Sequence, residues 1–302
     1  MTMICPASPE DEKALQDLTC AAGPVGSGRR RYGAAMYFNR KGQLSDAVLE
    51  VYRVCSLLDK EPPDALLKER GLLREKPVAP DASPPLLFSS LLEEVDFYLT
   101  GLGGPGIGEA RAGLARARTT QAAAVERRAS PVIDRWLPEA LVGLGQRHPA
   151  LAATLAAAAP HLHWHSYLSY PPEQIGATFL ANHSYAPIIG PEASPFAAED
   201  WEMGLFLIAP HVLYRDHCHQ APELYVPMTG PHGWRFGVGQ EMVILPADRP
   251  VWNDPFAVHM TKVGPTPFLC LYVWTCDLEP AARVVPADDW SRLEALRLDF
   301  GK

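Results

Sequence analysis

The sequence predicts an α+β protein in which a mainly helical N-terminal half, residues 1–160, precedes an all-β C-terminal half, residues 161–302. Two observations predict this fold class. Several segments of the first half repeat apolar residues at spacings of three and four, which is the pattern of amphipathic helices. After about His161, short runs of β-branched and aromatic residues alternate with Gly, Pro, Asn and Asp. Such runs indicate many short strands in a sandwich or a barrel.

Three segments of the first half carry the helix signals. Ser45–Leu58 and Leu86–Leu99 place their apolar residues on one helical face, and Ala110–Arg128 is rich in Ala and Arg, which are good helix formers. The stretch Lys76–Pro85 (KPVAPDASPP) lies between the first two. We expect a loop or linker there, because proline interrupts both helices and strand ladders.

The second half contains five clear candidate strands. They are Gly204–Ile208, Glu223–Met228, Trp234–Val238, Glu241–Leu245 and Phe268–Thr275. Their length and the turn residues between them favour one closed or stacked β-structure over separate βαβ units.

Composition limits the function classes. The chain has 302 residues, 47% of them apolar and 21% charged, which is typical of a globular protein with a core. A net charge of −8 argues against nucleic-acid binding. No apolar run is long enough to span a bilayer, and the start MTMICPASPEDEK has no apolar signal segment. The six cysteines form no CxxC pair, so we expect reduced thiols and a cytoplasmic location.

The segment YRDHCHQAPELYVPMTG, residues 214–230, places His217, His219, Glu223 and Tyr225 at odd numbers. Side chains on a strand alternate between its two faces, so one strand, kinked at Pro222, would point all four the same way. Imidazole and carboxylate groups that converge in this manner are typical ligands of a divalent transition metal. The alternative is a polar strand that faces solvent.

The spacing His217-x-His219-x3-Glu223-x6-Gly230 resembles the ligand-bearing part of the first cupin motif. His259 stands where the second cupin motif carries its histidine, although that motif's usual glycine and asparagine are replaced. The resemblance implies a cupin-type β-barrel, or double-stranded β-helix, in residues 161–302. It also implies that His217, His219, Glu223 and His259 bind zinc, iron, manganese or nickel. His232 is the rival ligand, and we expect it to face solvent in a turn.

A narrower resemblance includes two tyrosines. The pattern Tyr214-x2-His217-x-His219-x3-Glu223-x-Tyr225 resembles the signature of the cupin-type dimethylsulfoniopropionate (DMSP) lyases. Segments 170–176 (YPPEQIG) and 184–190 (SYAPIIG) are similar to further parts of that family. The resemblance covers about residues 86–302, and residues 1–85 have no recognisable counterpart. It implies a metal-dependent carbon–sulfur lyase that converts DMSP to dimethyl sulfide and acrylate.

The residues themselves are compatible with that chemistry. A divalent metal on three neutral histidines and one glutamate keeps a formal charge of about +1, which attracts a small carboxylate substrate and acidifies its Cα–H. Tyr225 is the expected base of a β-elimination, and Tyr214 is a second acid/base or a substrate contact. A sulfonium has no hydrogen-bond donors, so aromatic faces are its natural binding surface. The expected substrate-binding aromatics are Trp234, Trp252, Tyr272 and Trp274. Core packing is the alternative for each of them.

Other interpretations stay open. A cupin dioxygenase or isomerase acting on another small carboxylate is one, and a non-catalytic metal-binding sensor is another. Under each of these interpretations the helical half is a lid, a dimer surface or a wrapping layer, and a homodimer is one of the options.

Two further motifs receive structural interpretations. The cluster HLHWH, residues 161–165, predicts a strand edge or a cavity lining. The glycines Gly101, Gly103 and Gly106 match a dinucleotide fingerprint, but they follow a helix pattern and predict a helix–helix loop.

Overall fold

Helices build the first of two compact units, Met1–Glu94. Its elements are β1 (Thr2–Met3), α1 (Pro9–Leu18), α2 (Ser27–Arg40), α3 (Asp46–Val54), η1 (Cys55–Leu57), α4 (Asp64–Glu69), η2 (Leu73–Glu75) and β2 (Pro77–Val78). The expected helix at Ser45–Leu58 is confirmed as α3 and η1, and the Ser45 hydroxyl caps it by accepting the Val48 N–H. Phe38, Val48 and Leu67 are fully buried in the core of this unit.

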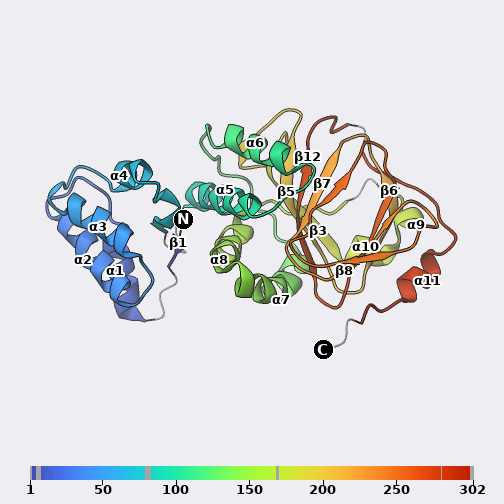
Figure 1. The fold of residues 1–302 in the computed structure, drawn as a ribbon, viewed down its shortest axis with the longest axis horizontal. Coiled ribbons are helices and arrows are strands. Elements are labelled where there is room, and N and C mark those ends of the chain that lie inside the picture. The colour runs from blue at the N-terminus through green and yellow to red at the C-terminus, as the bar shows by residue number, and fades with distance from the viewer. Residues whose placement is uncertain (1, 5–7, 79–82, 168–169, 280, 300–302) are drawn as a thin grey trace. The chain divides into compact units, whose positions relative to one another are not determined.

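The computed structural model describes residues 2–4, 8–78, 83–167, 170–279 and 281–299 (Figure 1). Residues 79–82 of the expected proline-rich linker therefore lie outside the described residues. Of the flanking residues, Pro77–Val78 form β2, which pairs in parallel with β1, and Pro84 begins helix α5 (Pro84–Thr100).

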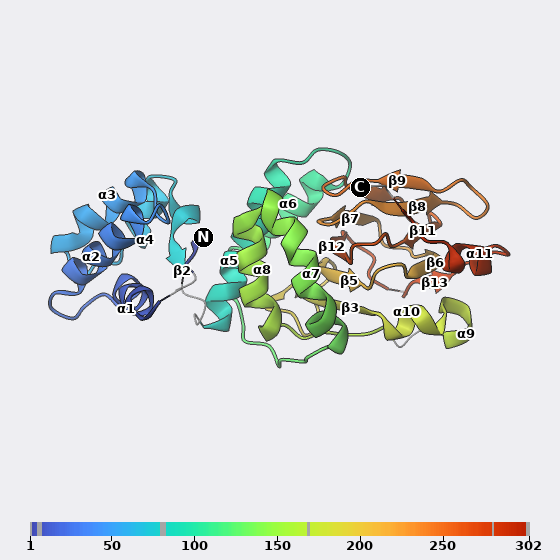
Figure 2. The ribbon, with the colours of Figure 1, turned by 90° about the horizontal axis from the view of Figure 1, so that it is seen from below.

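The second unit, Val95–Lys302, contains the remaining helices and two sheets. Its helical elements are the end of α5, α6 (Ile107–Ala117), α7 (Pro131–Arg147), α8 (Pro149–Ala158), η3 (Ala159–His161), α9 (Pro172–Ile175), α10 (Ala177–Ala181) and α11 (Trp290–Ala295). Helix α7 packs against the strands of one sheet, as Figure 2 shows. The compact units consequently divide earlier than the change from helices to strands, and a domain boundary at residue 160 stays a prediction.

Two antiparallel sheets form the β-structure of this unit. The strands are β3 (His183–Gly190), β4 (Phe196–Ala197), β5 (Glu202–Ile208), β6 (Leu213–Cys218), β7 (Glu223–Pro227), β8 (His232–Phe236), β9 (Val243–Leu245), β10 (Val251–Asn253), β11 (His259–Lys262), β12 (Phe268–Trp274) and β13 (Arg283–Val284). One sheet has the order β10-β7-β12-β5-β3-β4 and the other β13-β6-β11-β8-β9. Only the β3–β4 pair is parallel among the ladders of these two sheets. This is the expected cupin-type β-barrel, and all five predicted strands are present.

Aromatic side chains fill the space between the two sheets. Phe206, Tyr225, Trp234 and Phe268 belong to one buried cluster with ring centroids 5.7–6.5 Å apart. The candidate site is built into this cluster, so its side chains are held by packing on all sides.

Two sequence predictions about elements need correction. The helix expected over Ala110–Arg128 ends at Ala117, because the following segment pairs elsewhere: Ala123 N–H donates to the Pro195 carbonyl and Arg128 forms a β-bridge with His163. The single kinked strand expected around Pro222 is two strands in different sheets, β6 and β7. Tertiary pairing overrides local propensity in both places.

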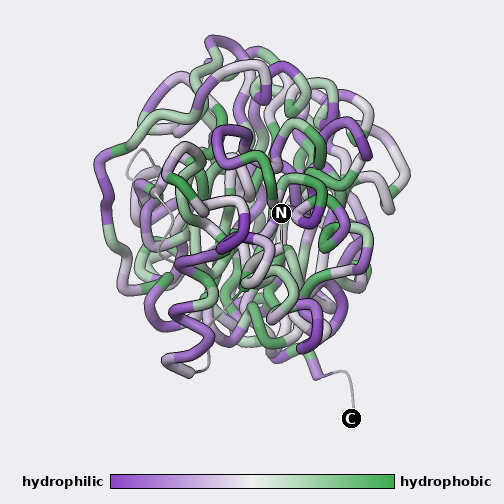
Figure 3. The backbone as a smooth tube through the Cα atoms, turned by 90° about the vertical axis from the view of Figure 1, so that its left-hand side faces the viewer, coloured by the Kyte–Doolittle hydropathy of each residue, from purple (hydrophilic) through white to green (hydrophobic). Residues whose placement is uncertain are grey.

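Hydropathy changes at short intervals along the chain, as the coloured tube in Figure 3 shows. Among the described residues, no helix combines the length and the apolar character that crossing a membrane requires.

The close packing of α6 at Gly113 predicts how a substitution there changes the free energy of unfolding. A Cβ at Gly113 would overlap the ring of Trp201, which is buried, whereas a Cβ at Gly143 in α7 has no neighbour within 4 Å. We expect Gly113→Ala to lower the free energy of unfolding by about 1–3 kcal/mol through overpacking. Gly143→Ala is the matched control and is expected to raise it by about 0.5–1 kcal/mol, because alanine is the better helix former. Urea denaturation measures both, and equal effects would contradict the packing described here.

Candidate active site

Three histidines converge inside the barrel. His217 on β6 lies directly opposite His259 on β11, and His219 follows the last residue of β6. Their ligand nitrogens all lie within 4.8 Å of one another. The three side chains are 1%, 4% and 0% exposed, in the order His217, His219 and His259. The change of sheet between β6 and β7 does not separate the expected ligands, because the facing sheets both point them inward.

Backbone carbonyls fix the tautomer of each histidine. Every Nδ1 lies 2.7–2.9 Å from a carbonyl oxygen, and a carbonyl only accepts, so every Nδ1 carries the proton. The acceptors are Arg215 for His217, Ala221 for His219 and Ala257 for His259. The Nε2 lone pairs therefore point toward one another. The Nε2 atoms of His217 and His259 are buried and have no hydrogen-bond partner among the described residues.

Glu223 closes one side of this group. Its Oε2 accepts from Asn253 Nδ2 at 3.2 Å and lies 3.1 Å from His219 Nε2 and 3.2 Å from His259 Nε2. Its Oε1 accepts from Trp274 Nε1 at 2.7 Å. The carboxylate is thus oriented by groups on β10 and β12, as an outer hydrogen-bond shell orients a metal ligand.

The protonation states of His217 and Glu223 favour metal binding. Burial, with the neighbouring His259 and His219, holds the pKa of His217 well below its usual value, so that imidazole is neutral. Burial opposes the charged form of Glu223, but the contacts with His219 and His259 outweigh it and hold the pKa of that carboxyl well below its usual range. Neutral imidazole and an ionised carboxylate are the forms that bind a divalent metal. The residues present fit such an ion, because the buried Nε2 atoms of His217 and His259 have no hydrogen-bond partner among the described residues.

Tyr214 and Tyr225 both point into the barrel next to the histidines. The Tyr214 ring stacks on His217 at 3.8 Å, and its hydroxyl lies 2.9 Å from the hydroxyl of Tyr170. The Tyr225 ring centroid is 6.1 Å from that of His259, and its hydroxyl makes no hydrogen bond to any described residue. Burial raises the pKa of both phenols well above the usual value, with Glu223 adding to the effect at Tyr225. Without a bound cation, both phenols are therefore neutral.

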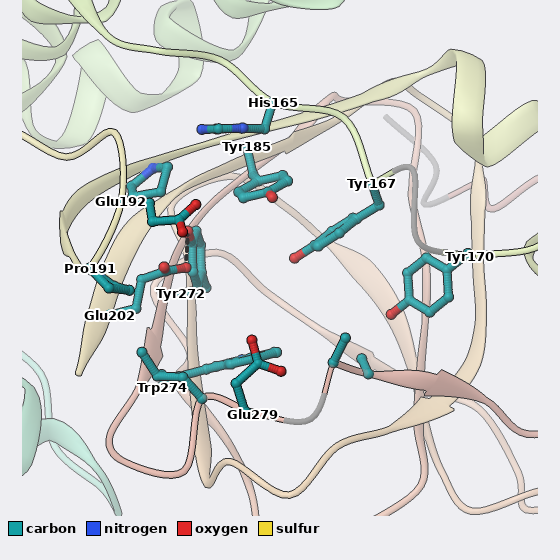
Figure 4. A pocket seen from close by; sticks show the side chains of 14 residues that line it. His165, Tyr167, Tyr170, Tyr185, Pro191, Glu192, Glu202, Tyr272, Trp274 and Glu279 are labelled. Carbon is teal, nitrogen blue, oxygen red and sulfur yellow. Dashed lines mark hydrogen bonds between the residues drawn. The ribbon is translucent and has the colours of Figure 1, made fainter. Parts of the chain in front are cut away.

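A cavity of about 320 Å³ reaches the histidine group through Trp274, which lines the cavity and stacks on His219. Figure 4 shows the hydroxyls of Tyr167 and Tyr170 pointing into it, with Tyr185 and His165 above and Trp274 and Glu279 below in that view. Its aromatic lining residues are Tyr167, Tyr170, Tyr185, Tyr272 and Trp274, and its acidic ones are Glu192, Glu202 and Glu279. Aromatic faces together with carboxylates favour a cation without hydrogen-bond donors.

Trp274 and Tyr272 connect the cavity to the barrel interior. The Trp274 ring stacks on His219 at 4.6 Å, while its Nε1 donates to Glu223. Tyr272 lies opposite Tyr225 in the strand register, and its hydroxyl donates to Glu202 at 2.8 Å. Trp234 is fully buried 5.7 Å from the Tyr225 ring, so it lies beside the expected base but does not line the cavity.

Trp252 is not brought to the site. Its strand neighbours Val251 and Asn253 face the interior, and Asn253 bonds Glu223, so alternation along β10 turns Trp252 outward. Its ring packs against Gly106, and its Nε1 donates to Asp254. The expected role of Trp252 in substrate binding is therefore wrong for this geometry.

The expectation for His232 is also wrong. His232 is fully buried rather than exposed to solvent. Its Nδ1 accepts the Gly264 N–H and its Nε2 donates to the Thr229 hydroxyl, so both of its polar atoms have partners inside the barrel. With both nitrogens engaged, it is not available as a metal ligand.

Acid sensitivity follows from this burial. Desolvation lowers the pKa of His232 from 6.5 to about 3. Below pH 6.5 the unfolded chain binds a proton that the folded chain does not, so stability falls as the pH falls toward 3. Between pH 7 and pH 5 we expect His232 to account for a loss of about 2 kcal/mol. Urea midpoints of the wild type and His232→Asn at both pH values test this, with His161→Asn as the control. Equal losses in all three proteins would contradict it.

Several cavity residues received no role from the sequence. His165 was expected only as part of a cluster, and its place in the cavity lining confirms one of the two interpretations. Tyr170 and Tyr185 lie in the segments that resemble the lyase family. Tyr167 and Glu202 carried no local signal, because neither lies near the ligand motif in sequence. The loop expected at Gly101–Gly106 is confirmed between α5 and α6.

Comparisons with known proteins agree with the resemblance. A family model described as dimethylsulfoniopropionate lyase matches residues 110–270. The dimethylsulfoniopropionate lyase DddQ of Ruegeria pomeroyi is 27% identical over 114 residues, which cover 38% of this chain and 56% of that enzyme. The chain thus spans little more than half the length of this curated relative.

Two solved structures are similar to this chain, and the first of them shares its fold. A chain from the crystal structures of the DMSP lyases RdDddP and RnDddQII matches with a TM-score of 0.53 and 22% identity, covering 68% of this chain and 100% of that chain. The crystal structure of DddQ from Ruegeria pomeroyi matches with a TM-score of 0.48 and 22% identity, over 66% of this chain and 96% of that one.

Proposed function

Because the chain belongs to the dimethylsulfoniopropionate lyase family, we propose that it cleaves DMSP to dimethyl sulfide and acrylate in a metal-dependent β-elimination. The observation that carries the proposal is the group of three buried histidines with unprotonated Nε2 atoms beside an aromatic, acidic cavity. An aromatic cavity suits the sulfonium end of the substrate, and a cation-binding histidine group suits its carboxylate end.

His217, His219, His259 and Glu223 would hold the metal, for which zinc, iron, manganese and nickel are the candidates. When bound, the ion supplies Lewis acidity that attracts the substrate carboxylate and lowers the pKa of the neighbouring Cα–H and of nearby phenols. The carbonyls of Arg215, Ala221 and Ala257 keep the three imidazoles in the tautomer that this requires.

Tyr225 is the proposed base. Its deprotonated hydroxyl takes the proton from the substrate Cα, the C–H electrons form the Cα=Cβ bond, and the Cβ–S electrons leave with sulfur as dimethyl sulfide. The proton ends on Tyr225 and is later released. The hydroxyl makes no hydrogen bond to a described residue, so it is not committed to another partner. Tyr214, fixed by its stacking on His217 and its bond to Tyr170, is a positioning residue for that imidazole.

The cavity residues bind the sulfonium. Trp274 presents an aromatic face and is held by its bond to Glu223, and Tyr167 and Tyr185 stack 4.5 Å apart. Glu192 and Glu279 are exposed among the lining residues, and their charge attracts the cationic end of the substrate. The cavity therefore orients DMSP with its carboxylate toward the histidines.

Trp274 offers a test of this orientation. We expect Trp274→Leu to raise the KM for DMSP about threefold to thirtyfold through loss of the cation–π contact. Trp274→Phe keeps an aromatic face and is expected to recover most of that loss. Trp252→Leu, which alters an outward-facing tryptophan, is the matched control and leaves KM unchanged. Steady-state kinetics measure all three, and an equal rise in Trp252→Leu would contradict the assignment.

Headspace gas chromatography tests the function. The full chain is depleted of metal, reconstituted separately with zinc, iron(II), manganese or nickel, and mixed with DMSP. We expect dimethyl sulfide from at least one reconstituted protein and none from the metal-depleted protein. Absence of dimethyl sulfide with all four ions would reject DMSP as the substrate.

A further inference from the structure

A second cavity lies within the first unit, far along the sequence from the family match at residues 110–270. Its volume is about 430 Å³. Leu18, Val78 and Leu86 contribute apolar walls, and Arg31, Tyr52 and Lys76 contribute polar groups. All of these residues precede Glu94, so the cavity belongs to this unit alone.

Arg31 is the unusual member of the lining. It lies on α2 and is only 3% exposed, yet no carboxylate of a described residue lies within 4.0 Å of its guanidinium. Its NH1 and NH2 groups donate to the carbonyls of Cys20 and Glu61 at 3.4 and 3.2 Å. Its buried Nε has no hydrogen-bond partner among the described residues. Two neutral carbonyls do not balance the charge, and the carboxylate of Asp59, which interacts with Arg31 electrostatically, makes no hydrogen bond to it. A buried guanidinium without a directly bonded carboxylate is unfavourable.

The acidic residues nearby are already engaged. Both oxygens of Asp59 accept backbone N–H groups, from Gly26 at 2.9 Å and Gly28 at 2.8 Å. Asp64, which lines the cavity, pairs with Lys76 at 2.7 Å. The lining therefore carries the charges of Arg31, Lys76 and Asp64, which leave a net charge of about +1.

We propose that this cavity binds a small organic carboxylate, whose charged group pairs with Arg31 and whose short apolar chain lies against Leu18, Val78 and Leu86. A guanidinium matches a carboxylate through two parallel N–H···O bonds, and the unpartnered Nε is one of the donors for them. The net charge of the lining suits a monoanion, and the apolar walls favour an acid with a hydrocarbon chain over inorganic phosphate. This site is independent of the lyase activity.

Methyl NMR of the full, metal-loaded chain locates such binding. The probe is hexanoate, and hexanol and inorganic phosphate separate the contribution of the carboxylate from those of the chain and of charge alone. We expect hexanoate to shift the methyl signals of Leu18, Val78 and Leu86 saturably, with a Kd of about 0.1–1 mM. Hexanol and phosphate are expected to leave them unchanged over the same range. Absence of hexanoate shifts, or equal shifts with hexanol or phosphate, would overturn the proposal.

Variants of α2 distinguish Arg31 from its neighbours. Arg31→Met is expected to weaken hexanoate binding at least about tenfold, and Arg31→Lys to weaken it less, because lysine keeps the charge but not the fork of donors. Arg29→Met changes an exposed arginine two residues away and is expected to bind as the wild type does. If Arg31→Met does not fold, the comparison of the hexanoate affinities of Arg31→Lys and Arg29→Met tests the role of Arg31. Wild-type affinity in the folded Arg31 variants would overturn the proposal.

Discussion

Tyr225→Phe is expected to lower kcat for DMSP cleavage by about 10²–10⁴-fold, the usual contribution of a positioned general base. KM is expected to change little, because the hydroxyl makes no hydrogen bond to a described residue and the phenylalanine keeps the ring contacts with Trp234 and Phe268. Steady-state kinetics on the metal-loaded protein measure both constants.

Tyr214→Phe is the control for this prediction. It removes the hydroxyl bond to Tyr170 but keeps the stacking on His217, so we expect kcat to fall by less than about tenfold. If Tyr214→Phe proves the more damaging change, the base is Tyr214 and the role of Tyr225 is packing. Undiminished kcat in both variants would remove tyrosine from the mechanism.

His217→Asn and His259→Asn are expected to abolish both metal content and activity. Each removes an Nε2 ligand from a preformed group, and the loss of one of four ligands, without rearrangement of the other three, weakens the binding of a divalent ion. The metal content of the purified protein, measured by mass spectrometry, is expected to fall from about one ion per chain to less than about a tenth of an ion per chain.

His232→Asn is the matched control, since His232 is equally buried in the same barrel but has both ring nitrogens engaged by Thr229 and Gly264. It is expected to keep its metal and most of its activity. Equal metal loss in all three variants would mean that the histidine group described here is not the metal site.

Local sequence pattern predicted that the histidines and the glutamate of residues 217–223 converge, because they lie close together along the chain. His217, His219 and Glu223 lie within seven residues, and alternation along one strand predicted that they share a face. In the structure β6 and β7 belong to facing sheets, and Glu223 points toward the histidines because β7 presents it to the barrel interior. The position of His259 required the family resemblance. Nothing local indicates that β11 pairs with β6, and that pairing brings His259 opposite His217.

Strand phase explains the failure at Trp252. Its aromatic character suggested a substrate contact, but the register of β10 against β7 pairs it with Leu224 and turns it away from Glu223. A shift of one residue would reverse that direction, and register is set by long-range pairing that the sequence does not display. Part of the cavity lining was hidden for the same reason, because Tyr167 and Glu202 meet the expected Trp274 only after three distant segments pack together.

The measurement that tests the central claim most directly is proton NMR of DMSP incubated with the metal-loaded protein. A β-elimination predicts that acrylate and dimethyl sulfide appear in equal amounts as DMSP disappears. Dimethyl sulfide accompanied by 3-hydroxypropionate in place of acrylate, or DMSP that persists unchanged, would contradict the account.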